Sequence, residues 1–204
     1  MSDRVMLFLD YQNVYMGARR TFADELSAHH SHGQIGPAAI GDLVVSASPY
    51  DRVLAGVRVY RGQPDASRDP KGYAACSRQI AIWEQDERVK VTSRTLKYPS
   101  GWPASHQPGE KPQEKGIDVA LAIDFVRLAI EERYDVGILM STDTDLKPAL
   151  EFVHRRGAQR VEVAAWSSND RQCRRLSIPG AQVWCHWLNQ AQYNAVRDRT
   201  NYAR

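Results

Sequence analysis

The regular alternation of short apolar runs with helix-length segments is the feature that most constrains the fold of this chain. Runs such as VMLFL are continuously apolar, as in strands that are buried on both faces of a parallel sheet. The strand-like segments are 5–10, the second half of 51–62, 88–98, 135–140 and 160–166, with a further candidate at 182–188. Helices are predicted over 11–22, 38–48, 72–86, 116–134 and 143–157, and a short one near 170–177. This order predicts an α/β protein, a three-layer α/β/α sandwich around a central, mainly parallel sheet.

The length of the chain indicates one domain, because 204 residues can bury one full core but are few for two. We therefore expect a single domain over residues 1–190, followed by a polar, basic C-terminal tail at 191–204. The segment 99–115 is rich in Pro, Gly and Lys and is expected to form a surface loop rather than a linker. The segment 116–134 is apolar nearly all round, which predicts a substantially buried helix.

The cysteines and the net charge limit the cellular compartment and the kinds of partner that are expected. Cys76, Cys173 and Cys185 are odd in number and lack any CxxC spacing, so neither a disulfide framework nor a zinc ribbon is expected. No apolar run approaches the roughly 20 residues that span a bilayer, and the first residues do not resemble a secretory signal. The expected location is the cytoplasm, with no membrane partner. The formal net charge of +3 permits a nucleic-acid partner without requiring one.

Acidic and amide side chains stand just after the ends of two predicted strands. Asp10 and Asn13 follow the first strand, and Asp143 and Asp145 follow the fourth. Asp118 lies in the first turn of the long apolar helix. In a sheet of order 3-2-1-4-5 the first and fourth strands are neighbours. All of these groups can then converge at the carboxyl edge, where the strand order reverses and such sheets bind ligands.

Two interpretations of these acids remain open at the level of the sequence. Two carboxylates 4 Å apart repel each other by about 4 kcal/mol at an effective dielectric of about 20. The aspartates could simply cap helices, because Asp is a good N-cap and suits the first turn. Alternatively, a cation relieves their repulsion, and the all-oxygen set suits Mg²⁺ or Mn²⁺ rather than zinc. The tract HHSH at 29–32 has no further zinc ligand at familiar spacing and is interpreted as a polar loop.

Four motifs, taken together in this order, resemble those of the NYN domain family, in particular its LabA-like branch among the PIN-like nucleases. The motifs are LFLDYQNVY, RVYRGQP, KGIDVALAIDF and ILMSTDTDLKPALEFVHRRG, and the resemblance covers most of residues 5–166. It implies a PIN-like sandwich whose acidic cluster holds a divalent metal for RNA cleavage. The family commonly has Ser-Gly-Asp-Ser-Asp where this chain has STDTD, so Thr142 adds a side chain next to the site.

The resemblance implies a set of site residues. Asp10, Asp118, Asp143 and Asp145 are the predicted catalytic residues, and with Asn13 they are the predicted ligands of Mg²⁺ or Mn²⁺. The substrate contacts are predicted from the residues themselves and not from the resemblance. They are basic, hydroxyl and aromatic side chains: Lys115, Ser141, Thr142, Arg61, Lys71, Lys111 and Trp102. Trp102, beside His106 in the Pro-rich loop, is the candidate for base stacking. Solvated lysines and hydroxyls that only satisfy backbone amides are the alternative interpretation.

Functions of different classes fit these features. The first is a divalent-metal-dependent endoribonuclease that hydrolyses RNA phosphodiesters, and the second is a non-catalytic RNA-binding or scaffold protein that keeps the fold. A phosphatase or nucleotide hydrolase is a weaker third. No P-loop or GxGxxG motif is present, which counts against a nucleotide cofactor. RNA binding through phosphates should weaken steeply with salt and show little sequence selectivity. A homo-oligomer formed through the Trp-containing C-terminal region is also considered.

Overall fold

The computed structural model describes residues 1–23, 31–104, 109–171 and 173–204. His29 and His30 of the HHSH tract and His106 of the Pro-rich loop lie outside the described residues. None of the helices in the described ranges combines the length and the apolar character that crossing a bilayer requires.

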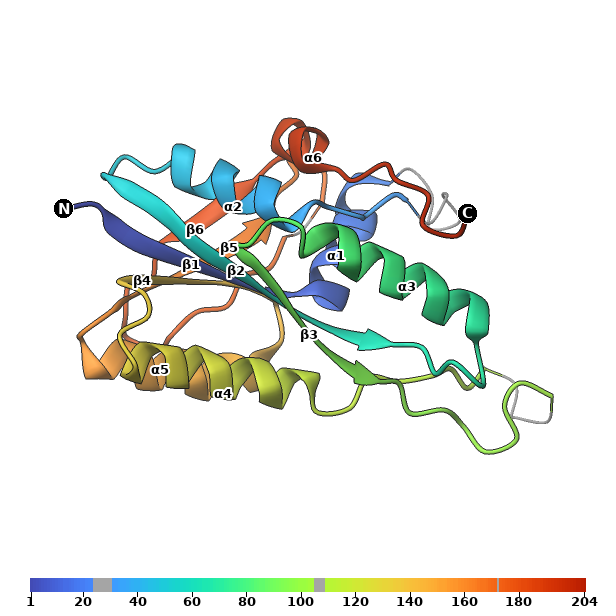
Figure 1. Ribbon diagram of the computed structural model, residues 1–204. Coiled ribbons are helices and arrows are strands. Elements are labelled where there is room, and N and C mark those ends of the chain that lie inside the picture. The colour runs from blue at the N-terminus through green and yellow to red at the C-terminus, as the bar shows by residue number, and fades with distance from the viewer. Residues whose placement is uncertain (24–30, 105–108, 172) are drawn as a thin grey trace.

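The core of the molecule is a parallel sheet of six strands in the order β3-β2-β1-β4-β5-β6 (Figure 1). The strands are β1 (Asp3–Asp10), β2 (Arg52–Gln63), β3 (Val89–Thr95), β4 (Val136–Met140), β5 (Arg160–Trp166) and β6 (Cys185–Leu188). The predicted parallel sheet and its 3-2-1-4-5 order are confirmed. The further strand expected within 182–188 is β6, which extends the sheet beyond β5.

Helices cover both faces of the sheet, as predicted for a three-layer sandwich (Figure 1). They are α1 (Tyr11–Phe22), α2 (Pro37–Ser46), α3 (Pro70–Trp83), α4 (Ile117–Ile130), α5 (Lys147–Arg156) and α6 (Gln190–Val196), with a short 3₁₀ turn, η1 (Thr144–Leu146). One core lies between the sheet and α1, α2, α3 and α6. The second core lies between the sheet and α4 and α5. The strands in the middle of the sheet must therefore bury both of their faces.

The central strands show why a continuous apolar run suits this position. Successive side chains of a strand point to opposite faces. In β1, Val5, Leu7 and Leu9 accordingly enter the core on one face, while Met6 and Phe8 enter the core on the other. All five are at most 3% exposed. A strand with a polar face could not occupy the middle of this sheet.

Two local expectations differ from the structure. The helix over 116–134 is not buried all round, because α4 packs on the sheet with one side and exposes Val119, Ile123 and Ile130 by more than half. The described residues within 170–177 form no helix. Leu176 is instead buried in the core beside α4 and α5 by an irregular segment, because that core needs apolar cover where no regular element supplies it.

The C-terminal residues, expected as a polar tail, run back over the domain. Tyr193 and Val196 of α6 belong to the core on the α1 and α2 side. The carbonyl oxygen of Tyr202 accepts two hydrogen bonds from the Arg78 guanidinium of α3, at 2.6 and 2.8 Å, and the Tyr202 side chain is 6% exposed. This packing brings the end of the chain to the carboxyl end of β2.

Candidate active site

The candidate site lies at the carboxyl ends of β1 and β4, which are neighbours in the sheet. From this pair the sheet grows in two directions, toward β3 on one side and β6 on the other, which makes the pair the point where the strand order reverses. Leu9 of β1 pairs with Met140 of β4. The next residues along the two strands are Asp10 and Ser141. The parallel register therefore places an aspartate and a serine side by side at the crevice.

Asp10 is held by hydrogen bonds to both carboxylate oxygens. Its Oδ1 accepts the backbone N–H of Asn13 at 3.2 Å, which caps α1, and its Oδ2 accepts the Ser141 hydroxyl at 2.9 Å. The residue is only 9% exposed. The capping interpretation of Asp10 is thus correct, but it accounts for only one of the two oxygens. The carboxylate is fixed in one orientation at the strand end.

Asn13 joins the first turn of α1 to the loop after β4. Its side-chain oxygen accepts two hydrogen bonds from Thr142, one from the backbone N–H at 3.1 Å and one from the hydroxyl at 3.0 Å. The side chain that Thr142 adds in place of the family's Gly therefore makes a contact. These two bonds use both acceptor positions of the amide oxygen, which favours a positioning role for Asn13 over that of a metal ligand.

The loop after β4 presents two aspartates differently. The N–H of Asp143 donates to the Ser141 hydroxyl oxygen at 3.0 Å, so Ser141 links Asp10 and Asp143. The Asp143 carboxylate caps η1 by accepting the N–H of Asp145 at 3.0 Å. Asp143 is half-buried, whereas Asp145 is exposed. Asp143 is the more closely integrated of the two.

Asp118 and Glu114 bring further negative charge to Asp10 from the start of α4. Burial raises the pKa of Asp10, and the charges of Asp143 and Asp118 raise it further, while the hydrogen bonds from Ser141 and Asn13 act in the opposite direction. Burial likewise raises the pKa of Glu114, with the charges of Asp10 and Asp118 adding to it and Gly62 and Arg61 opposing it. The carboxylates are therefore electrostatic neighbours across β1, β4 and α4.

Glu114 is the member of the site that the sequence analysis missed. Its carboxylate accepts the N–H of Gly62 at the end of β2. A Cβ on Gly62 would lie 2.8 Å from that oxygen, so only glycine allows this approach. Gly116, with a φ of +70°, turns the chain between Glu114 and Asp118. The signal in the sequence was an acid four residues before Asp118 in QEKGID, but only the fold shows that Glu114 is an electrostatic neighbour of Asp10.

The carboxylate oxygens of the site suit Mg²⁺ or Mn²⁺ that keeps some of its water ligands. They do not suit an ion that is enclosed entirely by protein side chains. No group of three His, Cys, Asp or Glu side chains within residues 1–23, 31–104, 109–171 and 173–204 is arranged to enclose a metal by itself. Mg²⁺ commonly keeps several waters and binds through one or two carboxylates together with substrate phosphates, and it takes oxygen ligands. The burial and mutual repulsion that raise the pKa of Asp10 and Glu114 are what a nearby cation would relieve.

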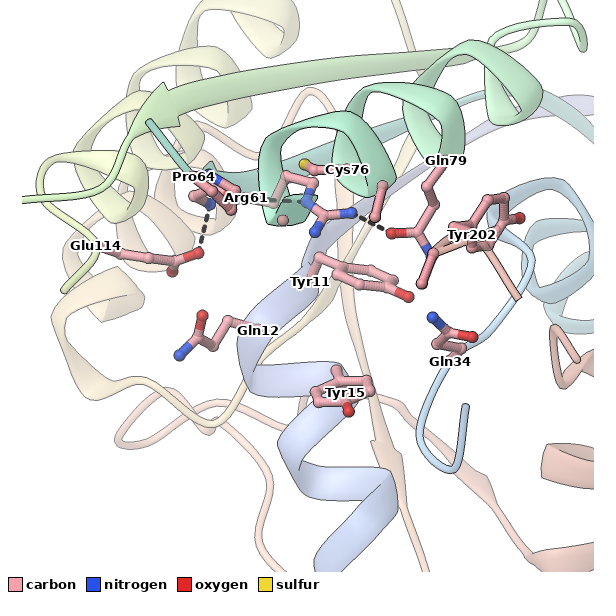
Figure 2. Close-up of a pocket in the computed structure, with 14 residues that line it drawn as sticks. Tyr11, Gln12, Tyr15, Gln34, Arg61, Pro64, Cys76, Gln79, Glu114 and Tyr202 are labelled. Carbon is pink, nitrogen blue, oxygen red and sulfur yellow. Dashed lines mark hydrogen bonds between the residues drawn. The ribbon is translucent and has the colours of Figure 1, made fainter. Parts of the chain in front are cut away.

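Hollows flank the acids on both sides. The first, of about 380 Å³, is lined by Glu114, Gly62, Arg61 and neighbouring residues of α1, α3 and the C-terminal segment (Figure 2). The second, of about 510 Å³, includes Asn13, Ser141 and Thr142 and three arginines, Arg20, Arg171 and Arg174. Arg171 donates to the carbonyl oxygens of Arg20 and Ala23 at the end of α1. The arginine-lined hollow thus brings positive charge beside the acids.

The predicted substrate contacts occupy different settings. Arg61 lies with its guanidinium carbon 5.1 Å from the Tyr11 ring and 5.6 Å from the Trp83 ring, and it donates to Gln79 Oε1 at 2.5 Å. These contacts favour a role in shaping the first hollow over a free phosphate contact. The predicted lysines, Lys71, Lys111 and Lys115, are exposed. In the surface loop, the centroid of the Trp102 ring lies 5.8 Å from that of the Tyr98 ring.

Comparison with known proteins identifies the family. The model of the NYN domain matches residues 4–176, most of the chain. The chain belongs to the NYN domain family. The NYN domain is a PIN-like nuclease family, so the acids described above lie at the switch point of a PIN-like nuclease fold.

Comparisons with individual proteins add no activity to the NYN assignment. No curated protein matches the chain. A crystal structure of a protein of unknown function from Vibrio parahaemolyticus RIMD 2210633 is similar, with 18% sequence identity and a TM-score of 0.49 over 80% of this chain and 81% of that chain.

Proposed function

We propose that this protein is a divalent-metal-dependent endoribonuclease that hydrolyses RNA phosphodiesters, and that it belongs to the LabA-like branch of the NYN family. The observation that carries the proposal is the set of carboxylates around Asp10 at the carboxyl edge of β1 and β4. Family membership supports it, because the NYN domain is a PIN-like nuclease family. The burial of Asp10 and the charges of its acidic neighbours raise its pKa, so keeping these carboxylates charged costs free energy unless a ligand binds them.

The proposed metal is Mg²⁺ or Mn²⁺, held by Asp10, Asp118 and Asp143, with Glu114 and Asp145 completing the acidic surroundings. When bound, the ion would supply Lewis-acid stabilisation of the reacting phosphoryl group and would activate water as a nucleophile. No covalent protein nucleophile is required. This ligand set goes beyond the family assignment and is part of the proposal.

The protein's own groups would fix and position the reacting atoms. Asp10 is immobilised by Ser141 and by the N–H of Asn13, so its carboxylate needs little reorganisation when substrate arrives. The contact of Thr142 with Asn13 holds the loop that carries Asp143 against α1. The arginine-lined hollow next to this loop would bind the RNA phosphates and offset the repulsion from the acids.

The second candidate is a non-catalytic RNA-binding or scaffold protein. It is favoured by one observation, that in the described part of the chain no three acidic side chains are already arranged around a metal position. Two exposed tryptophans support the further proposal of self-association. Trp184, which is 61% exposed, precedes the edge strand β6, and Trp187, which is 43% exposed, lies on it. Sedimentation velocity would test this proposal.

The test of the nuclease proposal is cleavage of end-labelled single-stranded and structured RNA in Mn²⁺, Mg²⁺ or EDTA. Asp143→Asn should lower the cleavage rate on the order of 100-fold or more, because it removes a charged metal ligand. RNA affinity should stay nearly unchanged. The matched control is Asp51→Asn, since Asp51 is exposed and precedes β2 at the opposite edge of the sheet.

Two outcomes would contradict the nuclease proposal. One is that the purified protein cleaves no RNA with either metal. The other is that Asp143→Asn cleaves as fast as the parent protein. RNA binding that survives in either case would favour the scaffold function.

A further inference from the structure

The first hollow beside the acids has the size and composition of a ligand cleft (Figure 2). Its volume of about 380 Å³ falls in the range of small-ligand pockets, which is about 300 to 1,000 Å³. Its lining includes the rings of Tyr11, Tyr15 and Tyr202 and the amides of Gln12, Gln34 and Gln79. Glu114 and Gly62 line it as well, so the cleft opens directly beside the acid site.

Gln79 directs an unpaired donor at this cleft. The residue is 4% exposed, and its Oε1 accepts a hydrogen bond from Arg61. Because a guanidinium can only donate, this contact fixes the amide with its oxygen toward Arg61 and its nitrogen away from it. Within the described ranges of the chain, Gln79 Nε2 is buried and has no hydrogen-bond partner.

Gln34, another lining residue of the cleft, supplies an unpaired acceptor. Its Oε1 is also buried and lacks a partner among the residues that the structure describes. Figure 2 shows the Gln79 side chain beside the Tyr202 ring and the Gln34 side chain below the hydroxyl end of Tyr11. Buried polar groups are normally paired, and those left unpaired in a native structure call for a bound partner or a functional role. A ligand that both accepts and donates would satisfy the two amides.

The walls of the cleft favour a flat, neutral heterocycle. The Tyr11 ring packs against Arg61 on one side and lies edge-on to Trp83, at 4.8 Å between ring centroids, so it is held rigidly. Among the described residues that line the cleft, Arg61 is the one cation and Glu114 the one anion, which suits neither a multiply charged ligand nor a lipid. Nucleobases combine a stacking face with donors and acceptors on their edges.

We propose that this cleft receives one nucleobase of the RNA, next to the phosphate that lies at the acids. The inference rests on the proposed function for the identity of the chain that carries the base. Where little sequence selectivity was expected, the base cleft predicts a preference among the four bases. The Gln79 donor and the Gln34 acceptor give the four bases unequal affinity, because their edges present different patterns of donors and acceptors.

The experiment measures binding in EDTA, so that it does not depend on cleavage. Fluorescence anisotropy compares labelled A, C, G and U hexanucleotides with the same hexanucleotides carrying one abasic position. We expect unequal affinities among the four bases. The preferred hexanucleotide should bind about tenfold more weakly when one position is abasic, as for the loss of a stacked base.

The variant Gln79→Met keeps the volume of the side chain and removes the amide. It should weaken the preferred hexanucleotide by about tenfold and leave the abasic one unchanged. Gln34→Met tests the acceptor independently, also where Gln79→Met does not fold. The matched control is Gln159→Met, since Gln159 is also a buried glutamine with an unpaired Oε1, but it precedes β5 at the opposite edge of the sheet.

The outcomes separate the base cleft from the nuclease activity. Equal affinity for all four bases and for abasic RNA, unchanged in both glutamine variants, would overturn the cleft even if the protein cleaves RNA. Unequal affinity that both variants abolish would support it even if no cleavage is seen. A free nucleoside monophosphate that competes as strongly as the hexanucleotide would overturn the assignment to RNA.

Discussion

Replacing Glu162 by glutamine should destabilise the whole sheet, because Glu162 is the buried anion that neutralises Arg52. The Arg52 guanidinium donates to the two Glu162 oxygens at 3.0 and 2.7 Å, and the side chains are 1% and 2% exposed. His186 Nε2 lies 2.7 Å from the same carboxylate. The cluster links β2, β5 and β6, and β2 and β5 are separated by two strands. Glu162→Gln keeps the shape of the side chain and removes the charge.

Two routes give the same magnitude for this change. Burial alone would raise the pKa of Glu162, but the hydrogen bonds and charges of His186 and Arg52 outweigh it and lower the pKa from 4.5 to about 2. At about 1.36 kcal/mol per pKa unit, this corresponds to about 3 kcal/mol of stability at pH 7. Leaving a buried cation without its partner costs about 3 to 5 kcal/mol in other proteins. We expect a loss of about 3 kcal/mol.

The sign of the pH dependence follows from the lowered pKa. The stabilisation is present above the unfolded value of 4.5 and is lost as the pH falls toward about 2. Urea unfolding of Glu162→Gln and the parent at pH 7 and pH 3 should therefore show a difference that shrinks to less than half at pH 3. Thermal scans at pH 7 should differ by about 6 to 12 °C.

A matched control separates burial from pairing. Asp135→Asn removes the Arg4–Asp135 ion pair, whose side chains are 45% and 42% exposed, and should cost less than about 1 kcal/mol. The reasoning is refuted if Glu162→Gln costs no more than this control at pH 7. A loss that is equally large at pH 3 and pH 7 would refute the electrostatic origin.

Two further predictions concern the acids and the arginine-lined hollow. Mn²⁺ at about 100 times its dissociation constant should add about 2.7 kcal/mol to the free energy of unfolding of the parent protein, as followed by urea unfolding. Asp10→Asn should lose most of that gain, and an equal gain would place the ion elsewhere. Arg174→Gln should lower the slope of log affinity for single-stranded RNA against log salt by about 0.7, the value for one lost phosphate contact. The control Arg155→Gln, in the last turn of α5 at the opposite edge of the sheet, should leave that slope unchanged. An unchanged slope for Arg174→Gln would show that the RNA does not contact the arginine-lined hollow.

The parts of the fold that were predictable are those where one physical requirement dominates. A run such as VMLFL suits only a strand with two buried faces, and its neighbours in sequence supply the covering helices. The exposure of Val119 and Ile123 was not predictable in the same way, because an apolar composition does not show how much of a helix the sheet covers. The segment around Leu176 follows no period, since its position depends on a gap in the core left by distant elements.

The residues of the candidate site also differ in how far the sequence alone could predict them. Asp10 and the residues after β4 could be placed from the sequence, because strand ends at a switch point are set by chain order. Glu114 could not, since its contact with Gly62 joins residues that are 52 positions apart. Arg61 resembles a phosphate contact when considered alone. Its partners come from two other parts of the chain, Tyr11 from α1 and Gln79 and Trp83 from α3, and only the fold brings them together.

The acids of the site lower the stability of the metal-free protein, and this cost bears on which function the chain performs. The raised pKa of Asp10 means that its contribution to stability is present at low pH and is lost as the pH rises through the folded value. The charged form of the Asp10 carboxylate is therefore a net cost in the absence of a cation. The neutral contacts between Thr142 and Asn13 already join α1 to the loop after β4 without the Asp10 charge. A protein that only bound RNA would be more stable, and would repel RNA less, with asparagine at position 10. The charge is useful where a divalent ion joins the carboxylates to a phosphate, which is the arrangement that the proposed hydrolysis of RNA would use.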